Sequence, residues 1–302
     1  MSLFDYSCRF LRRKILSVVV LITTVAGSGA YATMIDLSVA GSSGNLGSSA
    51  LFYQSDAQPT GTGVIDPFVR IKGNGNTIDV EQAYNTTVNG TFDVGPADNW
   101  NHAITLGDVG LVTVNNELYR EFFLDINESS SKAHGYLEQY ISLDEIKVYM
   151  GGAANSNTTD LSDGGPLGTL VYDFDEDPGD GLDNWVALNY GLGHGSGSGD
   201  MSFYLNNSFF DGWAETDNLV FYSLFGEIGD DPGQYNLASG DCDIGSRKHC
   251  DFGPSADFEE WAVVRATKTV RLPESSSQML LLLGVLSAYL LRRRFLAKAY
   301  IK

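Results

Sequence analysis

Basic residues are scarce in this chain. Its 302 residues include 19 Lys and Arg against 38 Asp and Glu, which gives a formal net charge of −19. Between residues 33 and 272 there are 10 basic and 36 acidic residues, so the charge of this region is 10 − 36 = −26. Binding to nucleic acid or to anionic lipid needs a cationic face. The composition therefore argues against both as partners of this region.

Long helical patterns are also missing. Between residues 33 and 272, short apolar runs rich in β-branched and aromatic residues alternate with clusters of Gly, Asn, Asp and Ser. This spacing predicts a single all-β domain over 33–265, a β-sandwich or jelly roll, followed by a linker at 266–272. The main strands are expected at 64–71, 111–114, 119–126, 146–149, 167–172, 201–205, 219–225 and 261–265.

Local signals refine this prediction at three places. Pro67 predicts a sheet edge or a bulge, because proline cannot donate to a β-ladder. The segment Ser142–Glu145 fits either a capped helical turn or the start of a strand. The polar clusters at 41–49, 73–76, 151–165, 191–200 and 226–241 predict loops, of which 151–165 is the best candidate for a long one.

The N-terminus has the pattern of a secretory signal peptide over residues 1–32. Arg and Lys residues at 9–14 precede a 12-residue apolar run, Ile15–Ala26, and Ala30 and Ala32 form an A-x-A cleavage site before Thr33. The alternative is an N-terminal membrane anchor, for which 12 residues are short. We therefore expect export by the general secretory route, although Arg12-Arg13 faintly resembles a twin-arginine signal.

The C-terminus combines three features in a fixed order. Pro273 and Glu274 precede a 13-residue apolar run, Met279–Leu291, and Arg292, Arg293 and Arg294 follow it. Such a run is marginal as a permanent transmembrane helix. The arginines would stay in the cytoplasm by the positive-inside rule, with the acidic domain outside. The alternative is an ordinary C-terminal membrane anchor.

This three-part tail, over 273–302, resembles the PEP-CTERM sorting signal of Gram-negative bacteria that make exopolysaccharide. Several motifs upstream are similar to a group of PEP-CTERM ectodomains, namely those at 66–68, 81–86, 121–128, 143–146, 195–201 and 258–261. The resemblance implies an exosortase and the secretion machinery as partners, transient insertion in the inner membrane, removal of the tail, and a final place at the cell surface or outside the cell. It implies no catalytic residue.

The sequence has only three cysteines, and Cys8 would leave with the signal peptide. Cys242 and Cys250 remain, and in an oxidising compartment such a pair predicts a disulfide. Closing this short loop removes roughly 2–3 kcal/mol of entropy from the unfolded chain. The alternative is a metal site that includes His249, although zinc sites usually have four ligands.

The densest acidic stretch, 173–183, suggests a calcium site. Asp173, Asp175 and Asp177 have the 1-3-5 spacing of a calcium loop, and Asp180 and Asp183 follow. Pro178 and Asn184 stand where an EF-hand needs Gly and Glu, so this is not an EF-hand. The alternative is a solvated acidic turn. Calcium is the one cofactor that the sequence suggests.

Two tryptophans are candidates for sugar binding. Trp100 and Trp213 lie beside polar residues, and an indole face with neighbouring amides suits a sugar ring. The alternative is a core position near a strand end, which the apolar surroundings of Trp261 favour for that residue.

Motifs for catalysis are missing. The four histidines lie in expected loops, and the run Gly195–Gly199 is neither a nucleophile elbow nor a phosphate loop. The sequence therefore predicts a non-enzymatic surface or matrix protein associated with exopolysaccharide. A calcium-dependent carbohydrate-binding module is the alternative, and a glycan hydrolase is a third hypothesis that would need two carboxylates at a set separation.

Overall fold

Strands form all the long elements of the described chain. The computed structural model describes residues 33–57, 65–72, 80–89, 91–94, 99–130, 132–133, 136–176, 183–193, 199–231, 235–242, 248–255 and 258–264. In these residues the only helices are three short 3-10 turns, η1 (Leu106–Asp108), η2 (Tyr190–Leu192) and η3 (Asn207–Phe210). None of them approaches the length of a membrane-spanning helix. The predicted signal peptide, linker and sorting tail lie outside the described residues.

The first of two seven-stranded sheets is built around one long central strand, β11. Its strand order is β1-β13-β11-β15-β5, with β12 also paired to β11 and β6 to β15. All these pairs are antiparallel except β1 with β13. The strands are β1 (Met34–Asp36), β5 (Glu81–Tyr84), β6 (Ile104–Thr105), β11 (Tyr140–Gly151), β12 (Gly168–Asp173), β13 (Trp185–Asn189) and β15 (Asn218–Phe225).

The second sheet has the order β2-β3-β14-β8-β18-β4, with β7 paired to β8. Every pair in it is antiparallel. Its strands are β2 (Ser43–Leu46), β3 (Ala50–Ala57), β4 (Ile65–Ile71), β7 (Leu111–Val114), β8 (Glu117–Asp125), β14 (Gly199–Asn206) and β18 (Glu259–Val264).

A small third sheet lies apart from the main pair. Its order is β16-β17-β10-β9, and its strands are β9 (Lys132–Ala133), β10 (Tyr136–Leu137), β16 (Asp230–Asp231) and β17 (His249–Asp251). Cys250 of β17 and Leu137 of β10 contribute to a separate buried cluster with Tyr140 and Trp185 of the first sheet. This cluster attaches the small sheet to the main body.

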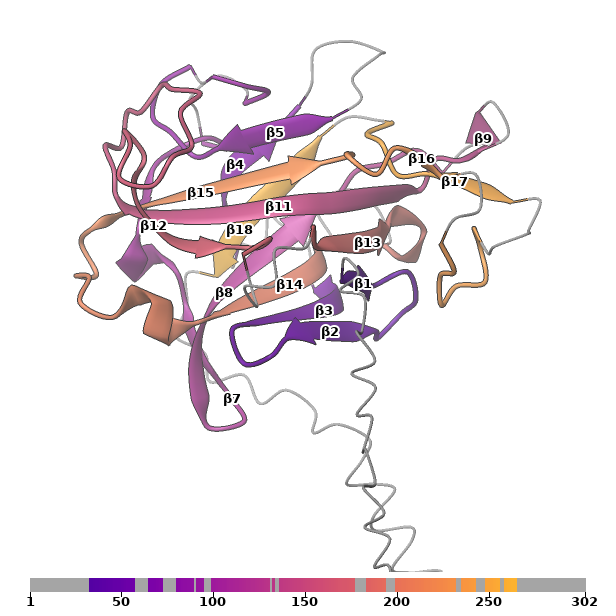
Figure 1. Cartoon of the computed structure of the whole chain (residues 1–302), viewed down its shortest axis with the longest axis horizontal. Coiled ribbons are helices and arrows are strands. Elements are labelled where there is room, and N and C mark those ends of the chain that lie inside the picture. Colours follow the sequence, from indigo (N-terminus) through magenta and orange to yellow (C-terminus); the bar gives the residue numbers. More distant parts are fainter. Residues whose placement is uncertain are drawn as a thin grey trace, which may run out of the picture. The chain divides into compact units, whose positions relative to one another are not determined.

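The two large sheets pack face to face through aromatic side chains. The ring of Phe221 on β15 lies 4.8 Å from that of Phe122 on β8 and 4.7 Å from that of Trp261 on β18, measured between centroids. In Figure 1 the strands β15, β11 and β13 run across the view, and β8 and β18 pass behind them at an angle. Alternating side chains of each strand enter this shared core, as expected for two stacked sheets.

The predicted all-β class and the eight main strands are confirmed, with bounds that differ by a few residues. Pro67 lies on β4, the edge strand of the second sheet, beside a register shift in its pairing with β18, so both expected features are present. Ser142–Glu145 belongs to strand β11 and not to a helical turn. Trp261 is fully buried, and its Nε1 donates a hydrogen bond of 2.9 Å to Ser223 Oγ.

The predicted loop 73–76 lies outside the described residues. Three other loop predictions need correction. Strand β14 begins at Gly199, within 191–200. Strand β2 lies within 41–49, and the two-residue strand β16 lies within 226–241. Polar residues can form such strands because backbone hydrogen bonds hold an edge strand without a buried side chain at every second position. The long loop predicted at 151–165 corresponds to residues 152–167, which contain no strand.

Candidate metal centre

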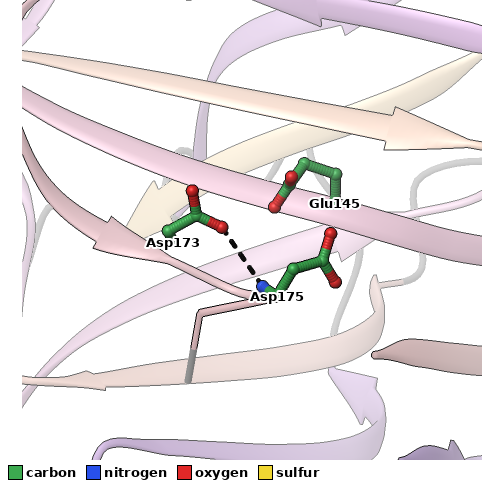
Figure 2. A group of neighbouring side chains, drawn as sticks. All are labelled: Glu145, Asp173 and Asp175. Carbon is green, nitrogen blue, oxygen red and sulfur yellow. Dashed lines mark hydrogen bonds between the residues drawn. The ribbon is translucent and has the colours of Figure 1, made fainter. Parts of the chain in front are cut away.

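Three carboxylates converge where β11 and β12 run side by side. Glu145 comes from β11, Asp173 ends β12, and Asp175 follows it. One carboxylate oxygen of each residue lies within 4.8 Å of one from each of the others. Figure 2 shows the three side chains gathered between the two strands. We call this group the β11–β12 carboxylate cluster.

The strand register explains why these residues meet. Lys147 of β11 lies directly opposite Asp173 of β12 in the antiparallel ladder. Side chains alternate between the faces of a sheet, so Glu145 and Lys147 share one face, and Asp173 and Asp175 continue along the same face of the neighbouring segment. Residues that are 26 or more positions apart in sequence are therefore cross-strand neighbours.

Lys147 provides a positive charge inside the cluster. Its Nζ contacts Glu145 Oε2 and lies 2.8 Å from Asp173 Oδ2. Asp175 is held differently, because its Oδ1 accepts a 2.9 Å hydrogen bond from the backbone N–H of Asn184 and its own N–H donates to Asp173 Oδ1 at 3.2 Å. With three acids and one lysine, the cluster has a formal charge of −3 + 1 = −2 when ionised.

Partial burial shapes the protonation of the cluster. The side chain of Glu145 is only 12% exposed and that of Asp173 14% exposed. Burial raises the pKa of Glu145 to about 8, although the hydrogen bond and charge of Lys147 oppose the shift. Burial also raises the pKa of Asp175 to about 6, with the hydrogen bond from Asn184 lowering it and the charge of Asp183 raising it. Burial alone would lower the pKa of Lys147, but its bonds to Asp173 and Glu145 raise it.

The donor set suits a hard divalent cation. Calcium binds six to eight oxygens at 2.3–2.6 Å, and two ligand oxygens of one ion can be no more than about 5 Å apart. Three carboxylates at the observed separation meet this requirement and could supply up to six of the oxygens. Calcium would have to compete with the Lys147 ammonium for Glu145 and Asp173.

The cluster contains part of the site predicted from the sequence. Asp173 and Asp175 come together, and Asp183 is close enough to act on the pKa of Asp175. Asp177 and Asp180 lie outside the described residues. Glu145 and Lys147 were not predicted as site residues. Their i, i+2 spacing on a strand was visible in the sequence, but the strand pairing was not.

The two candidate tryptophans have different surroundings. Trp100 is 37% exposed, and the guanidinium carbon of Arg70 lies 4.2 Å from its ring centre. Arg70 also lies 4.4 Å from the ring centre of Phe258 and pairs with Glu260, so its guanidinium contacts two aromatic rings and a carboxylate. The ring of Trp100 therefore packs on Arg70 of β4, in the second sheet. The β11–β12 carboxylate cluster belongs to the first sheet.

Trp213 packs against the main core. It is partly buried, and a Cβ atom added at Gly151 would lie only 2.9 Å from its Cζ3. The indole ring thus covers the backbone at the end of β11. This contact gives Trp213 a packing role whether or not it also contacts a ligand.

The predicted cysteine pair is joined. Cys242 and Cys250 form a disulfide with a Cα–Cα distance of 5.5 Å, and both are fully buried. The bond connects the chain before β17 to that strand within the small-sheet cluster.

Comparison of the chain with family models, curated proteins and solved structures finds no match. The resemblance to PEP-CTERM proteins therefore enters the proposal below as a prediction from sequence motifs.

Proposed function

We propose that this chain is an exported, non-enzymatic cell-surface or matrix protein that associates with exopolysaccharide, and that an exosortase sorts it and removes its tail. The observation that carries the proposal is the position of the fold between the two predicted cleavage sites. The first described strand begins at Met34, directly after Thr33, and the last ends at Val264, nine residues before Pro273. Both cleavages would leave every described strand in place.

The disulfide supports the same proposal. Cysteine pairs form and persist in oxidising compartments, and Cys242–Cys250 is buried in a cluster that attaches the small sheet. If the domain is exported, this bond forms in an oxidising compartment and can stabilise the fold there.

The intact mass of the native protein, taken separately from membranes and culture medium, tests this function. We expect a species that begins at Thr33 and ends near Glu274, with one disulfide. A chain that still ends at Lys302 and stays in the membrane would contradict processing by an exosortase. Cosedimentation of the purified 33–274 product with the producer's own polysaccharide then tests the association, and a product that stays in the supernatant would contradict it.

The β11–β12 carboxylate cluster favours a second candidate, a calcium-dependent carbohydrate-binding module. In this proposal calcium binds at the β11–β12 carboxylate cluster, and an exposed aromatic such as Trp100 contacts the sugar ring. A glycan array probed with calcium and again with chelator separates the two candidates. Binding that disappears with chelator supports the module, and equal binding in both conditions supports the simpler surface protein.

A further inference from the structure

Three glutamates from different parts of the chain meet inside the sandwich. Glu81 lies on β5 of the first sheet, Glu259 on β18 of the second, and Glu128 follows β8. They are 4%, 0% and 3% exposed, respectively. The carboxyl group of Glu259 is close enough to those of Glu81 and Glu128 for both to act on its pKa. We call this group the glutamate chain, because Glu259 stands between the other two.

Several carboxylate oxygens of the glutamate chain accept no hydrogen bond from an N–H or hydroxyl group of the described residues. Among the described residues, no N–H or hydroxyl group donates to either carboxylate oxygen of Glu259 or to Oε1 of Glu128. The second oxygen of Glu128 accepts from the backbone N–H of Ser255 at 2.8 Å and from its Oγ. No described Lys, Arg or His forms a salt bridge with Glu128 or Glu259. The groups that approach the open oxygens are therefore the other carboxyls.

Two ionised carboxylates cannot hydrogen-bond to each other, because both are acceptors only. Each contact between carboxyl groups needs one proton, as in pairs of acids that share a site. Two contacts among three carboxyl groups therefore need two protons and leave one negative charge. Three buried ionised carboxylates would instead carry an uncompensated charge of −3, which is far more costly in a low-dielectric interior.

We propose that Glu81, Glu259 and Glu128 form a proton-sharing chain whose two protons hold β5 of the first sheet to β18 of the second, and whose deprotonation at rising pH loosens this contact. The facing titratable groups are Glu81 from β5, Glu259 from β18 and Glu128 from the segment after β8. Among the described residues, Ser255 is the one further group that touches Glu128 with a hydroxyl donor.

Burial supports this assignment. It raises the pKa of Glu128 to about 8 and raises that of Glu259 well above its ordinary value, with the two other glutamates adding to the shift of Glu259. An unfolded glutamate has a pKa near 4.3. The folded protein then keeps the proton of Glu128 from about pH 4.3 to about pH 8 and that of Glu259 well above pH 4.3, while the unfolded protein releases both.

The pH dependence of unfolding tests the proposal. Over that window each retained proton raises the unfolding equilibrium constant about tenfold per pH unit, so two protons contribute up to about 100-fold. Glu259→Gln keeps the shape of the side chain but removes one titrating group. We expect the unfolding equilibrium constant of this variant to rise about tenfold per pH unit, where that of the wild type rises up to about 100-fold. Glu117→Gln, at an exposed glutamate of β8, is the matched control and should keep the wild-type slope.

Infrared difference spectroscopy gives a second readout that does not need the variant to be stable. The wild type at pH 7 should show the C=O band of a protonated carboxylic acid, and Glu128→Gln or Glu259→Gln should lose intensity in that band. Equal pH slopes for wild type and Glu259→Gln, or an unchanged band, would overturn the proposal. A melting temperature that calcium raises at pH 8 in the wild type but not in Glu259→Gln would also overturn it, in favour of a buried cation.

Discussion

At the scale of single residues, Asp175 is the most informative member of the β11–β12 carboxylate cluster. It does not contact Lys147, so its carboxylate can change without removing the salt bridges of Glu145 and Asp173. If calcium binds here, a free concentration about 100 times the Kd stabilises the fold by about 2.7 kcal/mol. We expect calcium to raise the melting temperature well above the effect of magnesium, and Asp175→Asn to abolish the difference. Asp211→Asn, at an exposed aspartate, should leave it intact.

Protons compete with calcium for the same oxygens. Because burial raises the pKa of Glu145 to about 8 and that of Asp175 to about 6, both groups lose protons as the pH rises from 5 to 8. Titration calorimetry should therefore give a calcium affinity that increases over this range. An affinity that is constant with pH would contradict a role for these two carboxylates.

Alanine variants of Trp100 and Trp213 distinguish a residue that binds sugar from one that packs on the core. Trp100→Ala removes an exposed ring from the Arg70 stack, and we expect polysaccharide binding to fall with little change in melting temperature. Trp213→Ala removes a ring packed on the core, and we expect a loss of stability of about 2–4 kcal/mol. Equal binding by wild type and Trp100→Ala would contradict the sugar-binding prediction for Trp100.

At the scale of elements, β11 and β12 approach each other closely at Gly168, the first residue of β12. Gly168 has φ +103°, and a Cβ atom there would lie 2.3 Å from the carbonyl oxygen of Met150. Gly47, in the β2–β3 turn, also has a positive φ, of +60°, but a Cβ atom there meets nothing within 4 Å.

Alanine substitutions should therefore differ at these two glycines. Gly47→Ala should cost only the left-handed backbone penalty of about 1–2 kcal/mol. Gly168→Ala adds a clash with backbone and should cost about 1–3 kcal/mol more. Urea unfolding of both variants measures the difference, and equal losses would contradict the close approach of β11 and β12.

The small sheet depends on the Cys242–Cys250 bond in a predictable way. The bond closes a loop with a sequence separation of 8, for which the chain-entropy model gives roughly 2–3 kcal/mol. We expect reduction to lower the free energy of unfolding by this amount while the aromatic core of the two large sheets persists. Thiol counting on native protein provides the control, since two titratable thiols would contradict the disulfide.

At the scale of the whole molecule, buried acids make stability depend on pH. Burial is the main cause that raises the pKa of Asp144 to about 7 and that of Asp200 to about 8. A folded pKa above the unfolded value means stability that is complete below about pH 4 and is lost as the pH rises toward the folded value. We therefore expect the urea midpoint to fall between pH 5 and pH 8.

Asp200→Asn tests the contribution of one such acid. Its Oδ2 accepts a 2.9 Å hydrogen bond from the N–H of Ile126, which an asparagine oxygen can also accept. The variant should remove one titrating group and reduce the fall in stability by about 1.4 kcal/mol per pH unit. A midpoint that rises with pH in the wild type would contradict the whole set of raised pKa values.

The sequence predicted the class of fold better than the sites. Alternating apolar residues made strands such as β8 and β15 visible, since their periodicity is local. The β11–β12 carboxylate cluster was only half predicted, because Lys147 meets Asp173 through the register of two strands joined by a long loop, and a local pattern does not specify that register. Glu81, Glu128 and Glu259 lie in motifs noted for their family resemblance, yet nothing in the sequence indicates that these three side chains share one interior.

The position of β18 constrains the order in which the domain can assemble. This strand, near the end of the described chain, lies between β8 and β4, and Trp261 at its centre packs on Phe221 of the other sheet. A chain that emerges from its N-terminus, from a ribosome or through a membrane pore, cannot complete the second sheet until residue 264 is free. On the proposed export route, a chain that enters a narrow channel before residue 264 has been synthesised therefore carries no complete second sheet that would have to be unfolded.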